Sequence, residues 1–171
     1  ADPDDRFLWR APVRRMEAEL VRDAVLHIAG KLDLTAGGPE LDEASGLTTN
    51  RRSLYYRHAQ EKQMVFLRLF DAASPNECYR RQQSVMPQQA LALANSPLAL
   101  GQSRVIAANL KGESDFVGAA FEQVLGRPPE NQERDACDAF LMEQSTRLAD
   151  AAKLTAFPAG DTPAVAPAAE P

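Results

Sequence analysis

The sequence contains few of the residues that usually hold metals or disulfide bridges. Among its 171 residues are only two cysteines, Cys78 and Cys137, and two histidines, His27 and His58. Two cysteines are too few for a disulfide framework or a structural zinc site. One disulfide or two buried free thiols both remain open, and two free thiols are the simpler state. No Cys-x-x-Cys-His motif occurs, so we expect no cofactor in this segment, and a c-type haem would have to be attached elsewhere.

Long apolar runs and basic clusters are also absent. No run approaches the roughly 20 apolar residues that a membrane-spanning helix needs, so the sequence predicts no membrane span. The formal net charge is −5, and the basic residues are scattered among acidic ones. The pairs 51–52 and 80–81 are too small to form a basic face. We therefore expect no nucleic-acid partner.

Helical patterns dominate what is present. In the first predicted helix, Met16, Leu20, Ala24 and Ile28 lie four residues apart and form an apolar stripe, which leaves the intervening charged residues on the other face. Prolines at first-turn positions and Ser84, Ser96 and Asp115 as N-caps mark later helix starts. We predict a mostly all-α fold, an irregular bundle of five to six helices with long loops. The predicted helices are 12–29, 63–70, 84–95, 97–110, 115–125 and 130–153, the last with Cys137, Phe140, Leu141 and Leu148 on its inner face.

Three segments do not fit a helix. Residues 32–50 contain glycines and proline among polar residues and read as a long loop. Residues 51–58 (RRSLYYRH) alternate in character and are the best candidate for one short strand or extended segment. Residues 156–171 consist mostly of Ala and Pro, which predicts a linker or disordered tail. We therefore expect one helical domain over 1–155 and a tail over 156–171.

Six strings occur in a fixed order along the chain: DPDDRFLWR, LDLTAGGP, RRSLYYRH, FLRLFDAASPNECYRRQQS, MPQQALALANSP and VLGRPPENQE. Together they resemble the C-terminal helical domain of unknown function in planctomycete-type secreted, cytochrome-associated surface proteins. The resemblance covers positions 2 to about 145. It implies an exported, extracytoplasmic protein (periplasmic or at the cell surface) in which this domain follows another helical domain and, often, a haem-bearing cytochrome c domain. It implies no catalytic residues. Family members continue into a final helix, so we expect this chain to be a truncated piece.

The candidate ligand-binding residues are the polar side chains around the 51–58 segment: Arg51, Arg52, Tyr55, His58 and Arg81. Guanidinium groups match carboxylates and sulfates with two parallel hydrogen bonds, which favours an anion or sugar-acid site. The alternative is structural, because arginines near loops also bind backbone carbonyls. Ser84 lacks a Gly-x-Ser-x-Gly elbow and is predicted to cap a helix, not to act as a nucleophile. His27 is predicted to be structural.

Two functions follow. The first is a non-catalytic structural or interaction module that packs on upstream domains of the same polypeptide. The alternative is an enzyme domain acting on extracellular polysaccharide, or in an associated oxidation, through Arg52, Tyr55, His58 and Arg81. The enzyme hypothesis requires these four side chains to converge on one pocket.

Overall fold

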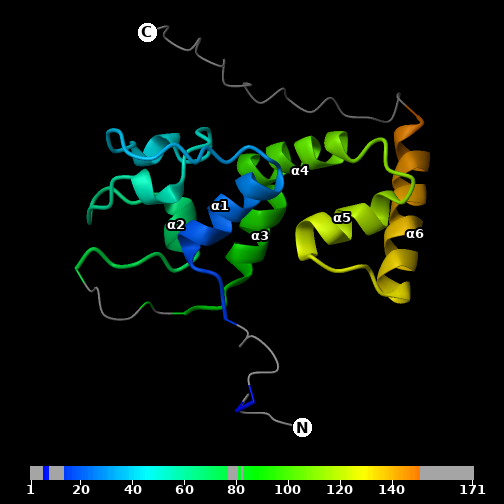
Figure 1. Ribbon diagram of the computed structural model, residues 1–171, viewed down its shortest axis with the longest axis horizontal. Helices are drawn as coiled ribbons and strands as arrows, with labels where there is room; N and C mark the ends of the chain where they lie inside the picture. Colours follow the sequence, from blue (N-terminus) through cyan, green and yellow to red (C-terminus); the bar gives the residue numbers. More distant parts are fainter. Residues whose placement is uncertain (1–5, 8–13, 77–80, 82, 151–171) are drawn as a thin grey trace, which may run out of the picture. The chain divides into compact units, whose positions relative to one another are not determined.

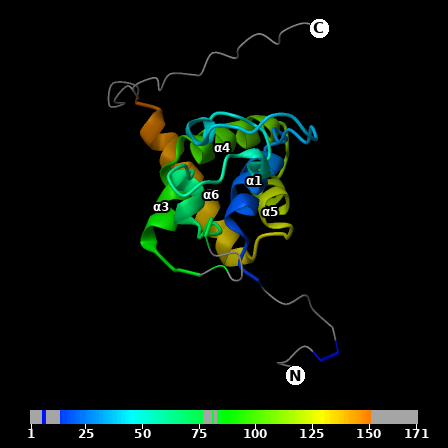
Figure 2. The ribbon, with the colours of Figure 1, turned by 90° about the vertical axis from the view of Figure 1, so that its left-hand side faces the viewer.

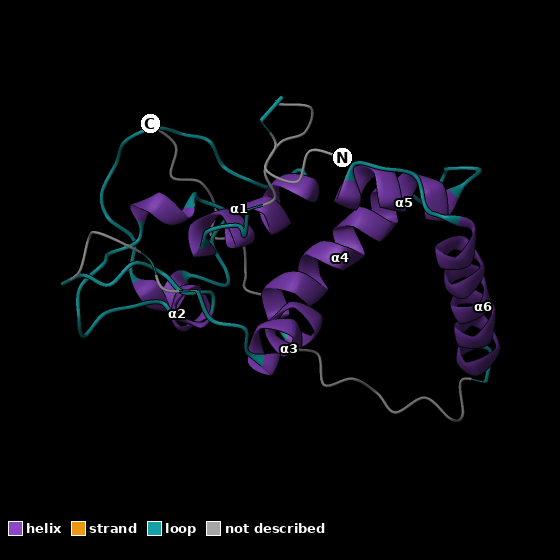
Figure 3. Cartoon of the chain, turned by 90° about the horizontal axis from the view of Figure 1, so that it is seen from below, coloured by secondary structure: helices purple, strands orange, loops and turns teal. Residues whose placement is uncertain are grey.

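The computed structural model describes residues 6–7, 14–76, 81 and 83–150. Over these residues it contains six α-helices and two short 3₁₀ helices, and Figure 3 draws only helices and loops there. The prediction of a mostly all-α fold is confirmed. In chain order the elements are α1 (Ala18–Ile28), η1 (Glu43–Ser45), η2 (Ser53–Tyr55), α2 (Val65–Leu69), α3 (Pro87–Asn95), α4 (Pro97–Asn109), α5 (Phe116–Leu125) and α6 (Asn131–Leu148).

The chain divides into two compact units, 1–102 and 103–171. In the first unit α1 contacts α2 and η2, and α2 contacts α3. Figure 1 shows the irregular segment between α1 and α2 (cyan) folded beside these helices. The core of this unit consists of side chains from α1, from the end of η2 and from α2: Ala18, Tyr56, Met64, Phe66, Leu67 and Phe70. In the second unit α5 packs against α6. The predicted tail and Cys78 lie outside the described residues.

The buried face of α1 differs from the predicted stripe. Ala18, Arg22 and Leu26 are the residues with no exposed surface, while Met16 and Leu20 are about half exposed, at 48% and 51%. The prediction was wrong because it placed the buried face by hydrophobicity alone. Arg22 has hydrogen-bond partners inside the fold, so the face of α1 that carries this charged residue is the buried one. Figure 2, which views the chain after a 90° turn, shows α1 (blue) beside the irregular segment that supplies those partners.

The 51–58 segment is not a strand. It contains η2, and on either side of η2 a single residue forms an isolated parallel bridge: Arg51 with Asp33 and Tyr56 with Leu41. The backbone N–H of Ser53 donates to the Asp23 carboxylate at 2.8 Å, so it is not available to a neighbouring strand. The long loop 32–50 therefore supplies the pairing partners of this segment, one residue at a time.

The predicted helix starts are confirmed where the capping side chain lies next to the first turn. Ser96 accepts from the N–H of Ala99 at 3.1 Å, and Asp115 accepts from the N–H of Gly118 at 2.9 Å, as expected for N-caps. Ser84 is not a cap, because α3 begins at Pro87 after Met86. The Ser84 hydroxyl instead donates to Asp71 at 2.6 Å. The hydroxyl that the local pattern predicted as a helix cap is therefore bound by a carboxylate 13 residues earlier in the chain.

Helix α6 has none of the buried face that its sequence suggested. No residue of this helix is buried, and Phe140, Leu141 and Leu148 are 57%, 41% and 59% exposed. Cys137 is half-buried and is a free thiol. The predicted inner face was wrong for this unit, because α5 alone does not cover it.

Candidate functional site

The centre of the first unit is a buried arginine. The side chain of Arg22 has no exposed surface, and its guanidinium donates to five residues of the segment that follows α1 and to its neighbour Asp23 on α1. The acceptors are the carbonyl oxygens of Gly46 (2.7 Å), Thr49 and Arg51 (2.8 Å), the hydroxyls of Tyr56 (3.0 Å) and Ser53 (3.3 Å), and the Asp23 carboxylate (3.3 Å). These bonds compensate the loss of hydration that burial of a charge entails. One side chain of α1 thus fixes the course of residues 46–56.

Asp23 completes this arrangement. Its carboxylate accepts from the hydroxyl of Ser53 at 2.6 Å as well as from the N–H of the same residue. Its charge is balanced by the adjacent guanidinium of Arg22, 3.3 Å away. Nε of Arg52 lies 4.0 Å from Oδ2 of Asp23. Asp23 therefore fixes η2 on α1 and places Arg52 at the edge of the same surface.

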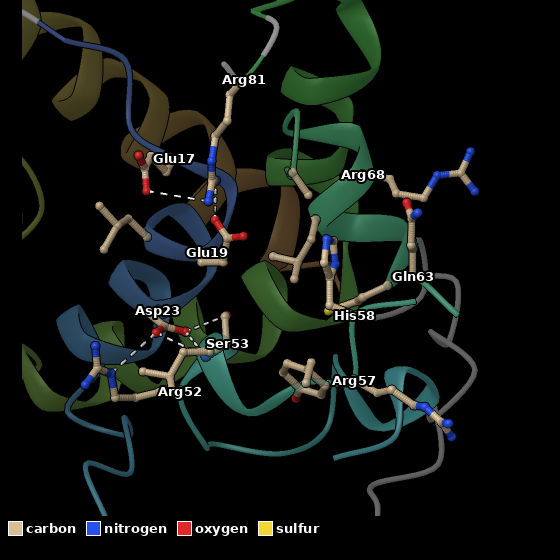
Figure 4. A pocket seen from close by; sticks show the side chains of 16 residues that line it. Glu17, Glu19, Asp23, Arg52, Ser53, Arg57, His58, Gln63, Arg68 and Arg81 are labelled. Atoms are coloured by element: carbon tan, nitrogen blue, oxygen red, sulfur yellow. Dashed lines mark hydrogen bonds and ion pairs between the residues drawn. The ribbon is translucent and has the colours of Figure 1, made fainter. Parts of the chain in front are cut away.

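A cavity of about 350 Å³ lies beside this joint, bounded by α1, η2 and α2 (Figure 4). Its lining combines an apolar floor with charged walls. The apolar residues are Leu20, Leu54, Tyr56, Met64, Leu67 and Ala72, and the polar ones are Glu17, Glu19, Asp23, Arg52, Ser53, Arg57, His58, Gln63, Arg68 and Arg81. Small-molecule sites are usually more apolar, with only a few polar groups, so the lining of this cavity favours a polar ligand over an apolar one.

Several charges of the lining are already paired. Arg81 donates to Glu19 at 2.5 Å and lies 3.8 Å from Glu17. The hydrogen bond to Glu19 and the negative charges of both glutamates raise the pKa of Arg81, against the opposing effect of burial. Arg57 pairs with Glu40 at 3.6 Å. Figure 4 shows Arg81 reaching toward Glu19, while Arg57 and Arg68 are directed away from α1.

The structure brings three of the five predicted site residues together. Arg52, His58 and Arg81 line the cavity. Arg51 and Tyr55 do not line it; they lie against each other, with the guanidinium carbon 4.2 Å from the ring centroid.

Arg51 and Tyr55 hold the loop between Asp33 and Gly38. Arg51 donates to the carbonyl oxygens of Gly37 at 2.5 Å and Thr35 at 3.2 Å. The hydroxyl of Tyr55 accepts from the N–H of Gly37 at 2.9 Å. Gly37 has a φ of 79°, in the left-handed region that favours glycine. These two side chains therefore have the loop-binding role that sequence reasoning held as the alternative.

The sequence analysis missed the acidic wall of the cavity. Glu19 and Asp23 lie one turn apart on α1 and both face the cavity, but they were assigned to the solvent side of the helix. A signal for the true face existed. Ala18 and Leu26 lie four residues before and after Arg22, so the three share one face of a helix. Only the partners of Arg22, 24 to 34 residues further along, show that this face is inside.

A second polar joint connects the end of α2 to the segment just before α3. Asp71 has a φ of 61°, and its carboxylate accepts from both the N–H (2.9 Å) and the hydroxyl (2.6 Å) of Ser84. Arg15 pairs with the same carboxylate at 3.2 Å. Burial acts to raise the pKa of Asp71, but the bonds from Ser84 and the charge of Arg15 outweigh it and lower that pKa. This joint fixes the chain just before α3.

Among the residues that the structure describes, no group of three or more His, Cys, Asp or Glu side chains could hold a metal ion. No helix within those ranges is long and apolar enough to cross a membrane.

The fold and the cavity together define a mostly α-helical domain with a polar, arginine-centred interior. Residues 1–141 match the family PSD1, described as a protein of unknown function (DUF1553), and the chain belongs to that family. No curated protein and no solved structure matches the chain.

Proposed function

We propose that the chain is a non-catalytic structural and interaction module of a secreted, haem-associated multidomain protein, in which it packs on an upstream helical domain of the same polypeptide. The observation that carries this proposal is the uncovered apolar surface of α5 and α6. Exposed apolar side chains on these two helices are Val124 (47%), Leu125 (57%), Phe140 (57%), Leu141 (41%), Met142 (73%) and Leu148 (59%). Large apolar side chains left exposed on two helices that pack together favour contact with another protein surface.

The wider setting rests on the resemblance of the six sequence strings. On this proposal the protein lies outside the cytoplasm, in the periplasm or at the cell surface, and belongs to a planctomycete-type protein. The haem would belong to an upstream cytochrome c domain, and this segment would contribute the packing surface. A helical partner fits α6, because helices pack through side chains that share one face, as Leu141 and Leu148 do at a spacing of seven residues.

Methionine oxidation tests this proposal with an internal control. Met142 is 73% exposed, whereas Met64 is 5% exposed in the core of the other unit. In this chain alone, dilute peroxide should oxidise Met142 rapidly and Met64 slowly, as peptide mass spectrometry measures. In the complete natural polypeptide Met142 should be protected.

A variant sharpens the result. Leu141→Asp, made in the complete polypeptide, should restore fast oxidation of Met142, while Arg147→Gln on the same helix should not. Equal oxidation rates of Met142 in the chain alone and in the complete polypeptide would contradict the packing role.

The second candidate function is an enzyme domain acting on extracellular polysaccharide or in an associated oxidation. One observation favours it: Arg52, His58 and Arg81 line a single cavity. Tyr55, the fourth residue of the hypothesis, lies outside that lining. Release of reducing ends from polysaccharide by the purified chain, lost in both Arg81→Ala and His58→Ala, would support it. Unchanged release in those variants would mean that the cavity is not the active site.

A further inference from the structure

We propose that the cavity between α1, η2 and α2 binds one sugar-acid unit, a ring-shaped polyol that carries a carboxylate, through charge-assisted hydrogen bonds from Arg52 and His58. The inference concerns binding at the cavity. It is independent of the packing surface on α6, and it does not require the domain to turn its ligand over.

The first step is that the cavity has two hydrogen-bond donors available to an anion. The side chain of Arg52 is 44% exposed, and its nearest acidic partner in the described part of the chain is Asp23, at 4.0 Å. That carboxylate is already occupied by Arg22 and Ser53. The Arg52 guanidinium therefore keeps N–H groups that can bind a carboxylate through two parallel bonds.

His58 lies at the other end of the same segment. Its side chain is exposed, it lines the cavity, and it makes no hydrogen bond to any residue that the structure describes. The remaining arginines differ. Arg81 is bound by Glu19, and Arg57 pairs with Glu40. Figure 4 shows Arg57 and Arg68 directed away from α1. Arg52 and His58 are thus the two donors of the lining that a bound anion would meet.

The second step is that the cavity also offers acceptors, which distinguishes a polyol from a simple anion. The Glu17 carboxylate is 59% exposed, and among the described residues its ion-pair partner is Arg81, at a long 3.8 Å. The amide of Gln63 donates one weak bond, at 3.4 Å, to the carbonyl of Gln60, so its oxygen remains an acceptor. Hydroxyl groups both donate and accept. A ligand rich in hydroxyl groups could donate to these oxygen atoms. An inorganic anion could not, and the Glu17 carboxylate would repel it.

The third step is the size and floor of the cavity. Its volume of about 350 Å³ lies near the lower end of the range for small-molecule sites, about 300–1,000 Å³. Leu20 and Leu54 line it and are 51% and 53% exposed. Such apolar side chains suit the C–H face of a sugar ring, because burying them on a ligand removes apolar surface from water. A single ring with one carboxylate fits the volume, the floor and the polar walls together.

The test uses the purified chain and four probes: D-galacturonate, D-glucuronate, D-galactose and acetate. Two-dimensional ¹H–¹⁵N NMR follows the amide signals of Ser53 and His58 during titration at low ionic strength. Saturable shifts are expected with a uronate. Galactose, which lacks the carboxylate, should bind about tenfold more weakly, the effect of one charge-assisted hydrogen-bond set. Acetate, which lacks the ring, should also bind about tenfold more weakly, because it cannot cover the apolar side chains of the cavity or donate to its acceptors.

Matched variants locate the site. Arg52→Gln and His58→Gln should each weaken uronate binding about tenfold. Arg57→Gln is the control, because it is the same change on the same cavity rim in a guanidinium that pairs with Glu40. Circular dichroism verifies folding, and if Arg52→Gln unfolds, His58→Gln decides.

Three results would overturn the proposal. They are no saturable shift with either uronate, equal affinity for galactose and a uronate, and equal weakening by Arg57→Gln and by the Arg52 or His58 variants. Because no turnover or partner binding is measured, this outcome is separate from the fate of either function proposed above.

Discussion

The guanidinium of Arg22 donates to the hydroxyl of Tyr56 at 3.0 Å and also faces its ring, with 5.0 Å between the guanidinium carbon and the ring centroid. Burial, the largest effect, raises the pKa of Tyr56, although the charge of Arg22 acts in the opposite direction. Tyr56 is in the apolar core and lines the cavity. This contact therefore joins the polar centre of the unit to its apolar core, and the cavity wall depends on both.

Arg22→Met should destabilise the first unit strongly. Methionine keeps the apolar stem, but three carbonyl oxygens lose their donor and Asp23 loses the neighbouring positive charge. Breaking a buried ion pair on one side costs about 3–5 kcal/mol. Urea unfolding followed by circular dichroism measures the change. Arg147→Met is the control, since that side chain is 66% exposed, and it should shift stability by less than about 0.5 kcal/mol. A loss below about 1 kcal/mol for Arg22→Met would contradict the central role of this side chain.

The sequence predicted the features of the fold that depend on neighbouring residues, such as the helices and their N-caps. The helices are there because turn residues, capping side chains and apolar spacing act over a few positions, as Ser96 and Asp115 show. The buried face of α1 could not be predicted in this way. Arg22 is inside because acceptors 24 to 34 residues away converge on it. Ser84 follows the same pattern, because its hydroxyl is bound by Asp71, 13 residues earlier.

The candidate site was predicted only in part. The strings around residues 51–58 identified Arg52 and His58, which line the cavity, together with Arg51 and Tyr55, which do not. Alternation along an extended segment places Arg51 and Tyr55 on one side and Arg52 and His58 on the other. The structure divides them in this way although η2 interrupts the segment, so the error came from grouping these side chains by their chemistry and not by the side they share. The acidic wall was missed because the orientation of α1 was wrong.

Arg51 and Arg52 should respond differently to the same substitution. Arg51→Gln removes the donor to the carbonyls of Gly37 and Thr35, so the loop loosens and the amide of Gly37 should exchange with deuterium about tenfold faster. Arg52→Gln should leave that exchange unchanged, because Arg52 makes no bond to this loop among the described contacts. Hydrogen exchange resolved by NMR measures both. Equal acceleration in the two variants would mean that Arg51 does not hold the loop individually.

Asp71→Asn and Asp71→Gly should both speed exchange of the Ser84 amide. Either variant removes the carboxylate that accepts from the N–H and hydroxyl of Ser84, and both residues tolerate the φ of 61° found at this position. If relief of backbone strain were the dominant effect, Asp71→Gly would instead protect Ser84 better than the natural chain does. NMR hydrogen exchange distinguishes the two. A matched change, Asp42→Asn, removes a carboxylate from a different turn, where it accepts from the N–H of Ala44, and should leave Ser84 unaffected.

Acid should loosen the second unit through Asp115. The hydrogen bond from Arg134 and that from the N–H of Gly118 lower the pKa of Asp115 from 3.8 to about 2, because both favour the charged carboxylate. A carboxyl group with a lowered pKa in the folded state stabilises that state above its unfolded value, and the contribution disappears as the pH falls toward the folded value. The Asp115 contribution should therefore be complete above pH 3.8 and should be lost as the pH falls to about 2.

The readout is the carboxyl ¹³C shift of Asp115 during an acid titration, with α-helix content followed by circular dichroism. Arg134→Gln removes the bidentate partner, which binds at 2.7 and 2.8 Å, so it should move the Asp115 titration toward 3.8. Arg127→Gln is the matched control, because its guanidinium binds Glu133, whose own pKa it lowers to about 2. It should shift the titration of Glu133 and leave that of Asp115 in place. An Asp115 that titrates near 3.8 in the unmodified chain would show that the pair with Arg134 does not persist in solution, and the pH dependence would then have to come from another carboxyl group.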